Sequence, residues 1–320
     1  MDAEVLRILV ERCQTDREIQ ELVSQSALDL SPLAGLPPDA RPIVFADAAG
    51  QLVNQSTTST WRKERGQYFT PPRVAQYMAG LTGELPAHVR FLEPGAGSGV
   101  LVAALAEYLT SRPQVTALHI DAYENAPRLP AILELTIGYT RRYLAERGIR
   151  MEYTIHDEDF ILSNAETIQP TLFKPSSHVT REYDLVISNP PYFKLPKSDL
   201  RIRIFSHMVH GQPNIYALFM TLATHLLAGG GRFIFITPRS FCSGRYFRRF
   251  RKWLFSRVSI DRIHVFESRK DAFGRDAVLQ ENVILAGTKS LPISDAPVTI
   301  SSSELETKFC NELLAGFDRA

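Results

Sequence analysis

The sequence has few cysteines, and they lie far from one another. Cys13, Cys242 and Cys310 form no CxxC pair and show no zinc-ligand spacing. An odd number of widely separated thiols does not make the disulfide framework of a small secreted domain. We therefore expect reduced cysteines, a cytoplasmic protein and no metal site.

Long apolar runs, a leader segment and a charge imbalance are missing as well. No run reaches the roughly 18 apolar residues of a membrane-spanning helix, so we expect no membrane partner. The opening residues, MDAEVLRILVERC, carry acids among their apolar positions, unlike a secretory signal. The net charge of +1 gives no overall argument for nucleic acid. The chain has 320 residues, and 44% of them are hydrophobic. This is enough to bury the core of one large domain with a small appendage.

Three segments divide the chain. Residues 1–60 begin with helical spacing of apolar residues, then contain several prolines and a polar stretch rich in serine and threonine at 51–60. This pattern predicts a helical appendage followed by a linker. Residues 61–290 are expected to form the main domain. Residues 291–320 form a tail whose SSELETKFCNELLAGF run predicts a helix.

Within residues 61–290, short β-type runs alternate with helical segments. Continuous apolar strands separated by helices predict a doubly wound α/β domain with a mostly parallel sheet. The last two runs lack a long helix between them and predict an antiparallel hairpin at the end of a seven-stranded sheet. The expected strands are VRFLE (89–93), ALHIDAYE (117–124), RMEYTIH (150–156), YDLVIS (183–188), RFIFIT (232–237), SIDRIHVF (259–266) and NVILAG (282–287), with helices near 98–110, 128–147, 214–228 and 242–256.

Ligands of such sheets lie at the carboxyl ends of the strands. The first strand runs into FLEPGAGSGVL, whose glycines let the backbone turn tightly against a ligand. The second strand ends at Glu124, which can accept hydrogen bonds from ribose hydroxyls, and the third ends before Asp159-Phe160, an acid and an aromatic that suit an adenine. Each feature alone also fits a structural turn or a solvated acid. Their succession indicates adenosine, and the GAGSG loop with the motif after the fourth strand favours S-adenosylmethionine over NAD.

That fourth strand ends in Asn189-Pro190-Pro191-Tyr192. Two prolines fix an extended path after Asn189, so the Pro190 carbonyl and the Asn189 side-chain carbonyl can converge as two acceptors. Such a pair suits a planar NH2 group, and the Tyr192 ring offers a face to a flat substrate. Alignment of that nitrogen with a sulfonium methyl group contributes roughly 7–11 kcal/mol. An isolated NPP is equally compatible with a tight turn, but here it predicts methyl transfer to an amino group.

Together these motifs resemble the gamma-type DNA adenine-N6 methyltransferases of restriction–modification systems, over about residues 63–288. RGQYFTPPRVAQYMAGL (65–81) is similar to the family segment that closes over the methionine end of S-adenosylmethionine, and VLQENVIL (278–285) is similar to a PstI/BsuBI-like subgroup. The resemblance implies a SAM-dependent methyltransferase Rossmann-like fold. It implies catalytic roles for Asn189, Pro190, Tyr192 and Phe273, with Phe266 as the alternative to Phe273. It implies cofactor contacts for Tyr68, Thr70, Pro71, Glu93, Gly95, Ala96, Gly97, Ser98, Glu124, Asn125, Asp159 and Phe160.

A duplex substrate adds two demands. The adenine must be flipped out of the helix, which costs a few kcal/mol, and stacking on an aromatic ring offsets about 1–3 kcal/mol of this. Phosphates need local positive charge, and no Asp or Glu lies between Leu200 and Ile260, where arginines are dense. The aromatics of SGRYFRRFRKWLF also fit the buried stripe of an amphipathic helix. The arginines that we expect to face DNA are Arg239, Arg245, Arg248 and Arg249.

Members of this family usually carry a separate target-recognition domain after the sheet, and residues 291–320 are too few to form one. The resemblance therefore leaves three alternatives: a missing C-terminal domain, a separate recognition subunit, or a stand-alone catalytic domain. The partners that it implies are double-stranded DNA and a cognate restriction endonuclease. NPPY also occurs in enzymes that methylate a glutamine amide in protein or a base amine in RNA, so these substrates stay open. A non-catalytic DNA-binding partner of the same fold and a dinucleotide oxidoreductase stay open too.

Overall fold

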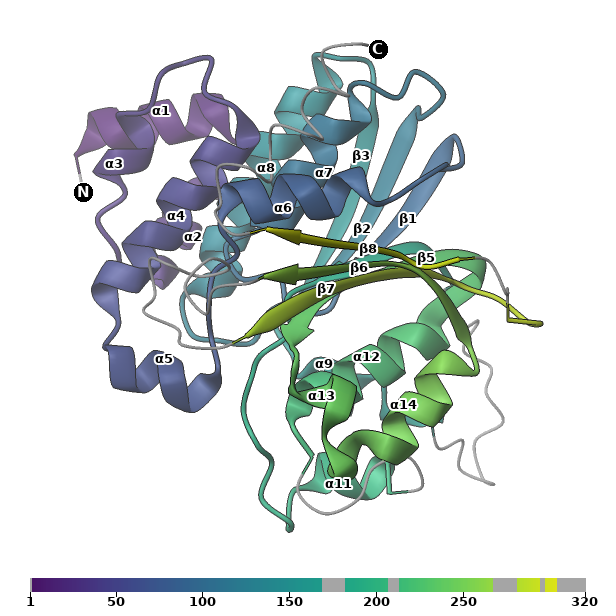
Figure 1. The fold of residues 1–320 in the computed structure, drawn as a ribbon. Coiled ribbons are helices and arrows are strands. Elements are labelled where there is room, and N and C mark those ends of the chain that lie inside the picture. Colours follow the sequence, from purple (N-terminus) through teal and green to yellow (C-terminus); the bar gives the residue numbers. More distant parts are fainter. Residues whose placement is uncertain (1, 169–181, 207–212, 267–280, 294–296, 304–320) are drawn as a thin grey trace.

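The computed structural model describes residues 2–168, 182–206, 213–266, 281–293 and 297–303. Within these residues, one eight-stranded sheet in the order β3-β2-β1-β4-β5-β7-β6-β8 forms the centre, and helices cover both faces (Figure 1). All of the predicted strands are present. The strands are β1 (His88–Glu93), β2 (Ala117–Tyr123), β3 (Arg150–His156), β4 (Tyr183–Ser188), β5 (Leu227–Pro238), β6 (Val258–Phe266), β7 (Asn282–Lys289) and β8 (Thr299–Ser303).

The sheet is mostly parallel, as predicted. β1 pairs with β2 and β4, β2 with β3, and β4 with β5, all in parallel. β7 lies antiparallel between β5 and β6, which confirms the antiparallel pairing predicted for the last two runs. The number seven was wrong, because β8 adds a strand parallel to β6. Thr299 and Ile300 are β-branched and suit a strand, and β8 continues through Ser302 and Ser303, where the predicted helical run was expected to begin.

Helices cover both faces of the sheet (Figure 1). α6, α7 and α8 lie on one face, and α9, α12 and α14 lie on the other. Almost every residue of α7 and α12 is buried, as expected for helices of an inner layer. No helix in the described ranges is both long enough and apolar enough to cross a membrane. These elements are α6 (Pro72–Gly80), α7 (Val100–Leu109), α8 (Leu129–Ala145), α9 (Phe160–Ser163), α10 (Ala165–Ile168), α11 (Leu200–Ile204), α12 (Ile215–Leu226), α13 (Ser240–Ser243), α14 (Arg248–Phe255) and the 3-10 turn η1 (Arg245–Phe247).

The N-terminal residues form further helices that pack against α8. The Phe45 ring in this segment stacks on Tyr139 of α8 with centroids 4.4 Å apart. Residues 51–60 are therefore helical for most of their length and do not form an extended linker. Pro42 begins the long helix at a position where its missing N–H has no cost, and Val53 keeps the stretch anchored to the core. The helices are α1 (Ala3–Arg12), α2 (Ile19–Ser26), α3 (Ser31–Ala34), α4 (Pro42–Ser56) and α5 (Ser59–Arg65).

The strand order sets the place of the candidate site. β1 is flanked by β2 on one side and by β4 on the other, so the order reverses there. Leu92 near the end of β1 lies opposite Val186 of β4. The loops that follow the two strands therefore leave the same edge of the sheet, the usual place for a ligand in open α/β sheets. One loop is the glycine loop, and the other is NPPY.

Candidate active site

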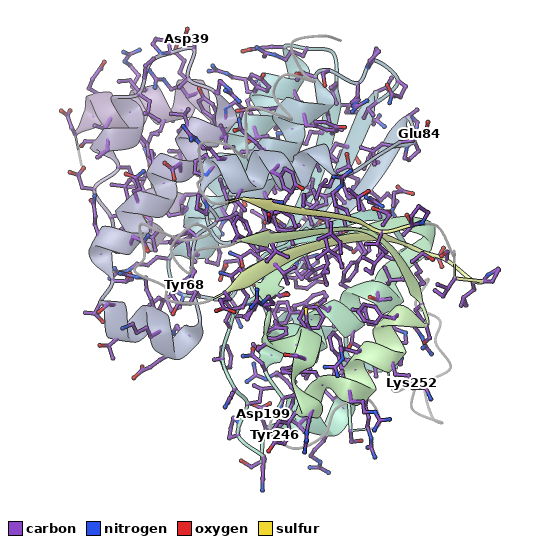
Figure 2. All side chains as sticks on the ribbon, viewed as in Figure 1. Asp39, Tyr68, Glu84, Asp199, Tyr246 and Lys252 are labelled. Atoms are coloured by element: carbon purple, nitrogen blue, oxygen red, sulfur yellow. The ribbon has the colours of Figure 1, made fainter. Side chains whose placement is uncertain are left out.

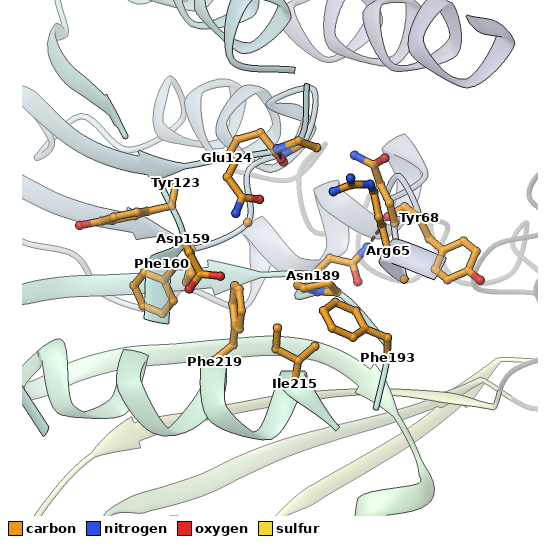
Figure 3. Close-up of a pocket in the computed structure, with 18 of the residues that line it drawn as sticks. Arg65, Tyr68, Tyr123, Glu124, Asp159, Phe160, Asn189, Phe193, Ile215 and Phe219 are labelled. Carbon is orange, nitrogen blue, oxygen red and sulfur yellow. Dashed lines mark hydrogen bonds between the residues drawn. The ribbon is translucent and has the colours of Figure 1, made fainter. Parts of the chain in front are cut away.

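A pocket of about 370 Å³ opens at the carboxyl ends of the parallel strands (Figure 3). Its walls are residues 64–69, the glycine loop, the residues after β2 and β3, residues 189–193 and the first turns of α12. This size is within the range of small-molecule sites. Motifs that are far apart in the sequence thus share one cavity. In the part of the chain that the structure describes, no group of three or more His, Cys, Asp or Glu side chains is placed to hold a metal ion.

Glu124 holds the glycine loop. The Gly97 N–H, in a residue with φ of +57°, donates to Glu124 Oε2 at 2.8 Å, and the Ala126 N–H donates to Oε1 at 2.8 Å. Burial raises the pKa of Glu124, and these backbone bonds oppose that shift. A carboxylate oxygen can accept more than one hydrogen bond. Glu124 can therefore order the loop and still accept hydroxyl donors from the pocket.

Glu93 lies behind the same loop at the end of β1. Its side chain is 1% exposed, and among the described residues no donor reaches Oε2. Burial, and then the charge of Glu124, raises the pKa of Glu93 well above its usual value of 4.5. The Ser98 hydroxyl is also buried and lacks a partner within the described residues. Neither residue is among those that line the pocket, so both lie in the layer behind the glycine loop.

The raised pKa of Glu93 predicts one contribution to the pH dependence of stability. With a folded-state pKa above the unfolded value, Glu93 keeps a proton in the folded chain that the unfolded chain releases above about pH 4.5. Its contribution to stability is thus greatest below that pH and falls as the pH rises toward the folded pKa, by up to about 1.4 kcal/mol per pH unit. We expect Glu93→Gln to lose less stability than the wild type between pH 5 and pH 7. Denaturant unfolding at both pH values measures this, and equal losses in the two proteins would contradict it.

Asp159 stands at the end of β3, as predicted, but it already has partners. Its Oδ1 accepts the two backbone N–H groups that begin α9, at 3.0 and 2.9 Å. Its Oδ2 accepts Arg201 Nη1 at 3.0 Å, and Arg201 also donates to Asp199 Oδ2 at 2.7 Å. Arg201 belongs to the acid-free stretch that we took for a basic surface, yet it lines the pocket. Any donor that reaches Asp159 must therefore share this carboxylate with Arg201.

Aromatic side chains form the apolar part of the pocket. The Phe160 ring centroid lies 5.2 Å from that of Phe219 and 5.0 Å from that of Tyr123. Phe193 and Ile215 border the same space (Figure 3). Of these five residues, the sequence identified only Phe160. The NIYALFM run predicted a helix, but it did not show which of its apolar residues face a cavity.

Residues 64–71, here named the strap, border the pocket before α6. The Gly66 carbonyl accepts the Tyr192 N–H at 3.1 Å. Gly66 has φ of +58°, and a Cβ there would lie 2.4 Å from the Tyr192 nitrogen, so only glycine fits. Thr70 and Pro71 are buried, and Pro71 is the N-cap of α6. The Tyr68 ring turns away from the pocket's Glu124 side (Figure 3).

The strap fixes the orientation of Asn189. Asn189 Nδ2 donates to the Tyr68 carbonyl at 2.9 Å and to Thr70 Oγ1 at 3.1 Å. Because two acceptors face Nδ2, the amide orientation follows, and Oδ1 points away from the strap. Oδ1 accepts the Tyr192 hydroxyl at 2.5 Å and keeps a second lone pair. Pro190, the residue predicted to supply the other acceptor, is buried next in the chain.

Tyr192 is buried and does not present its ring to the pocket. The side chain is 7% exposed, and its hydroxyl oxygen also lies 2.9 Å from the Ile236 carbonyl, so its one hydrogen is shared between that carbonyl and Asn189 Oδ1. The ring lies near those of Tyr68 and Tyr216, with centroid distances of 6.3 and 6.2 Å. Burial raises the pKa of Tyr192 well above 10, so the hydroxyl remains a donor. The open face expected for Tyr192 is thus not found in this conformation, in which Phe193 borders the pocket instead.

The predicted DNA-facing arginines fall into two groups. Arg245, Arg248 and Arg249 are exposed on η1 and α14, while the apolar side of α14 is buried. Arg239 is half-exposed and pairs with Glu281, with Nη2 and Oε2 2.8 Å apart. The first group therefore has its charge directed to solvent, and the fourth arginine shares its charge with an acid.

The remaining predicted residues surround the pocket or lie outside the described residues. Gly95 and Asn125 border the cavity, and Ala96 is buried behind it. Phe273 lies outside the described residues, and its alternative Phe266 is buried at the end of β6. Arg65 borders the pocket but was not predicted; its only signal was its place just before GQYFTPP.

Comparison with known proteins shows which proteins this chain is similar to. Residues 132–273 match the family model described as Eco57I restriction-modification methylase. The chain is similar to restriction–modification methyltransferases over about three quarters of its length. It is 31% identical over 246 residues to Type II methyltransferase M.PstI of Providencia stuartii. The matched region covers 77% of this chain and 47% of that protein. It is 34% identical over 248 residues to Type II methyltransferase M.BsuBI of Bacillus subtilis. Here the matched region covers 76% of this chain and 47% of that protein.

This chain spans about half the length of these restriction–modification methyltransferases. Among solved structures it resembles a putative class I S-adenosylmethionine-dependent methyltransferase from Listeria monocytogenes, with a TM-score of 0.60, 14% identity and 99% of both chains covered. The fold is that of the SAM-dependent methyltransferases, which confirms the predicted fold class. The resemblance to a PstI/BsuBI-like subgroup is also confirmed.

Proposed function

We propose that this chain is the catalytic part of a DNA methyltransferase that transfers a methyl group from S-adenosylmethionine to N6 of a flipped-out adenine. Its setting would be a restriction–modification system. The observation that carries the proposal is the fixed Asn189 amide, whose Nδ2 is held by Tyr68 and Thr70 so that Oδ1 faces away from the strap. The relatives named Type II methyltransferases support the same reaction class. Residues 61–290 would be the catalytic domain.

The pocket residues fit S-adenosylmethionine, which supplies a methyl group on a positively charged sulfur. Glu93 and Glu124 place two carboxyl groups at the glycine loop, where a cationic ligand would favour their ionised forms. Glu124 suits the ribose hydroxyls, and Phe160 with Phe219 suits the adenine ring. Arg65 at the rim is a cation available to the ligand's carboxylate.

The chain's own residues would activate the acceptor nitrogen. Asn189 Oδ1 and the Pro190 carbonyl accept the two hydrogens of a conjugated NH2 group. This draws its lone pair out of the ring plane and toward the methyl carbon. The new carbon–nitrogen bond forms as the carbon–sulfur bond breaks, and the surplus proton passes to solvent. Orientation contributes most of the effect, since no strong base is required.

Glu124 gives a direct test of the cofactor site. Glu124→Ala removes the acceptor of the Gly97 and Ala126 N–H groups and of the proposed ribose bonds. Hydrogen bonds to charged groups contribute about 1.5–3 kcal/mol, so we expect S-adenosylmethionine to bind roughly 10- to 100-fold more weakly. Glu124→Gln should also weaken binding, because its NH2 group would face a backbone N–H. Calorimetry measures the affinities, and an unchanged value in both variants would contradict the assignment.

The substrate is decided by a labelling experiment. The protein is incubated with methyl-labelled S-adenosylmethionine and duplex DNA, tRNA, rRNA or a release factor, and the labelled atom is identified. Label on adenine N6 supports the proposal. Label on an RNA amine or a glutamine amide would move the reaction to that substrate. Binding of NADH without binding of S-adenosylmethionine would overturn the reaction class.

A further inference from the structure

A second hollow, of about 560 Å³, lies beside the candidate active site. Its lining includes Lys194 and Lys197 from the loop after NPPY, and Tyr246, Phe247 and Phe250 from η1 and α14. The chemistry proposed above makes no use of this hollow.

A short two-stranded wall separates the two cavities. Lys194 and Asn214 form an antiparallel bridge, and the Ile215 N–H donates to the Phe193 carbonyl at 2.9 Å. Side chains of an extended chain alternate between its two faces. Phe193 and Ile215 accordingly border the candidate active site, whereas Lys194 and Asn214 border the hollow. Consecutive Cα atoms are about 3.8 Å apart, so the two cavities are immediate neighbours.

Tyr246 holds an exposed ring on a fixed turn. Its side chain is 72% exposed, at the lower end of the molecule in Figure 2. The next residue, Phe247, is anchored because its ring stacks on Tyr216 with centroids 5.7 Å apart. Arg251 Nη1 donates to the carbonyls of Phe241, at 2.6 Å, and Gly244, at 2.8 Å, which secures the turn before Tyr246. The backbone is thus well held, while the ring contributes little burial to the fold.

The surroundings of the hollow are positively charged. Lys194 and Lys197 are exposed, and none of the described residues that line the hollow is acidic. Asp199 is close to Lys197 in the chain, but Arg201 binds both of its carboxylate oxygens, at 2.9 and 2.7 Å. The exposed Arg245 lies next to Tyr246. An apolar floor, an exposed aromatic ring and a cationic rim are complementary to a nucleotide, which pairs a flat base with a phosphate.

We propose that this hollow binds a nucleotide of the DNA strand next to the one that enters the active site. The Tyr246 ring stacks on its base, and Lys194 and Lys197 bind its phosphates. Stacking on the neighbouring base would hold the strand in place while the target base is out of the helix. This inference rests on the proposed function, because it takes DNA as the substrate.

The test uses a short fluorescein-labelled single strand of deoxyadenosine, whose bases reach the protein without flipping. Fluorescence anisotropy measures its binding to the wild type and to matched variants. Loss of one stacked base costs about 1–3 kcal/mol, so we expect Tyr246→Ala to bind roughly 5- to 100-fold more weakly. Tyr246→Phe should bind within about twofold of the wild type. Phe255→Ala removes a half-exposed ring of α14 outside the hollow and should leave binding unchanged.

The lysines are tested through the dependence of binding on salt. The double variant Lys194→Gln and Lys197→Gln should lower the slope of log affinity against log salt by about 0.7 for each phosphate that the protein no longer binds. Lys252→Gln is the charge control, since Lys252 is exposed on α14 (Figure 2). Lys252 does not line the hollow. Normal S-adenosylmethionine binding by every variant shows that the fold is intact.

The outcomes separate this inference from the proposed function. A wild-type chain that binds no DNA, single-stranded or duplex, would overturn both. A wild-type chain that binds DNA, with Tyr246→Ala binding as tightly as the wild type, would overturn the inference alone. Equal losses in Tyr246→Ala and Phe255→Ala would do the same, because the effect would then not belong to the hollow.

Discussion

Asn189→Ala will abolish methyl transfer while leaving the affinity for S-adenosylmethionine within a few fold. The substitution removes the Oδ1 acceptor proposed for the amine and also the two Nδ2 bonds to Tyr68 and Thr70. Losing one fixed polar group that acts on the reacting atoms typically costs about 10²–10³ in kcat. The glycine loop and Glu124 do not depend on Asn189, so cofactor binding should persist. Single-turnover transfer to DNA and calorimetry measure the two quantities.

Thr70→Val is the graded control for that experiment. It keeps the size of the buried side chain and removes one of the two acceptors of Asn189 Nδ2, while the Tyr68 carbonyl remains. A neutral hydrogen bond is worth about 0.5–1.5 kcal/mol, so transfer should fall only about 2- to 10-fold. Transfer by Asn189→Ala at a rate near that of the wild type would refute the role of this amide.

The second large effect is expected from Gly66→Ala, which should disable both cofactor binding and transfer. Its Cβ would lie 2.4 Å from the Tyr192 nitrogen, so the strap must move away from NPPY. Thr70 and the Tyr68 carbonyl move with it, and Asn189 loses its orientation. We expect at least about tenfold weaker S-adenosylmethionine binding and about 100-fold slower transfer, as misplacement of reacting groups by about 1 Å causes.

Gly83→Ala separates the close contact from backbone strain. Gly83 also has a positive φ, +70°, but a Cβ there meets nothing within 4 Å. Both variants carry the left-handed strain of about 1–2 kcal/mol. Gly83→Ala should therefore lose stability in a denaturant titration and keep normal binding and transfer. Equal functional losses in the two variants would show that the contact of Gly66 with Tyr192 does not matter.

The fold could be predicted from the sequence where one pattern had one physical meaning. The strand that ends at Glu93 and the strand that ends at Ser188 are short runs that are buried for most of their length, as expected for inner strands of a parallel sheet. Residues 51–60 misled us, because serine and threonine are as compatible with the exposed side of a helix as with a linker. Thr299–Ser303 are too few to signal a strand without the neighbouring β6, whose edge they extend.

For the site, the sequence identified positions better than contacts. It placed Glu124, Asp159 and Asn189 at strand ends, and the sheet brings these ends together. It did not predict the hydrogen bond between Arg201 and Asp159, since these two residues follow different strands. The burial of Tyr192 was missed for the same reason: the acceptor at Ile236 comes from β5, which no local pattern reveals.

The hydrogen bond from the Tyr192 hydroxyl to Asn189 Oδ1 affects how strongly an approaching amine binds. Without that bond the oxygen would be a poorly solvated acceptor, and any small donor would gain by filling it. With the bond in place, the oxygen is already partly satisfied, so an amine that binds to its second lone pair gains less affinity. The contact then contributes mainly where the nitrogen becomes tetrahedral and its hydrogens more acidic, which favours rate over ground-state binding.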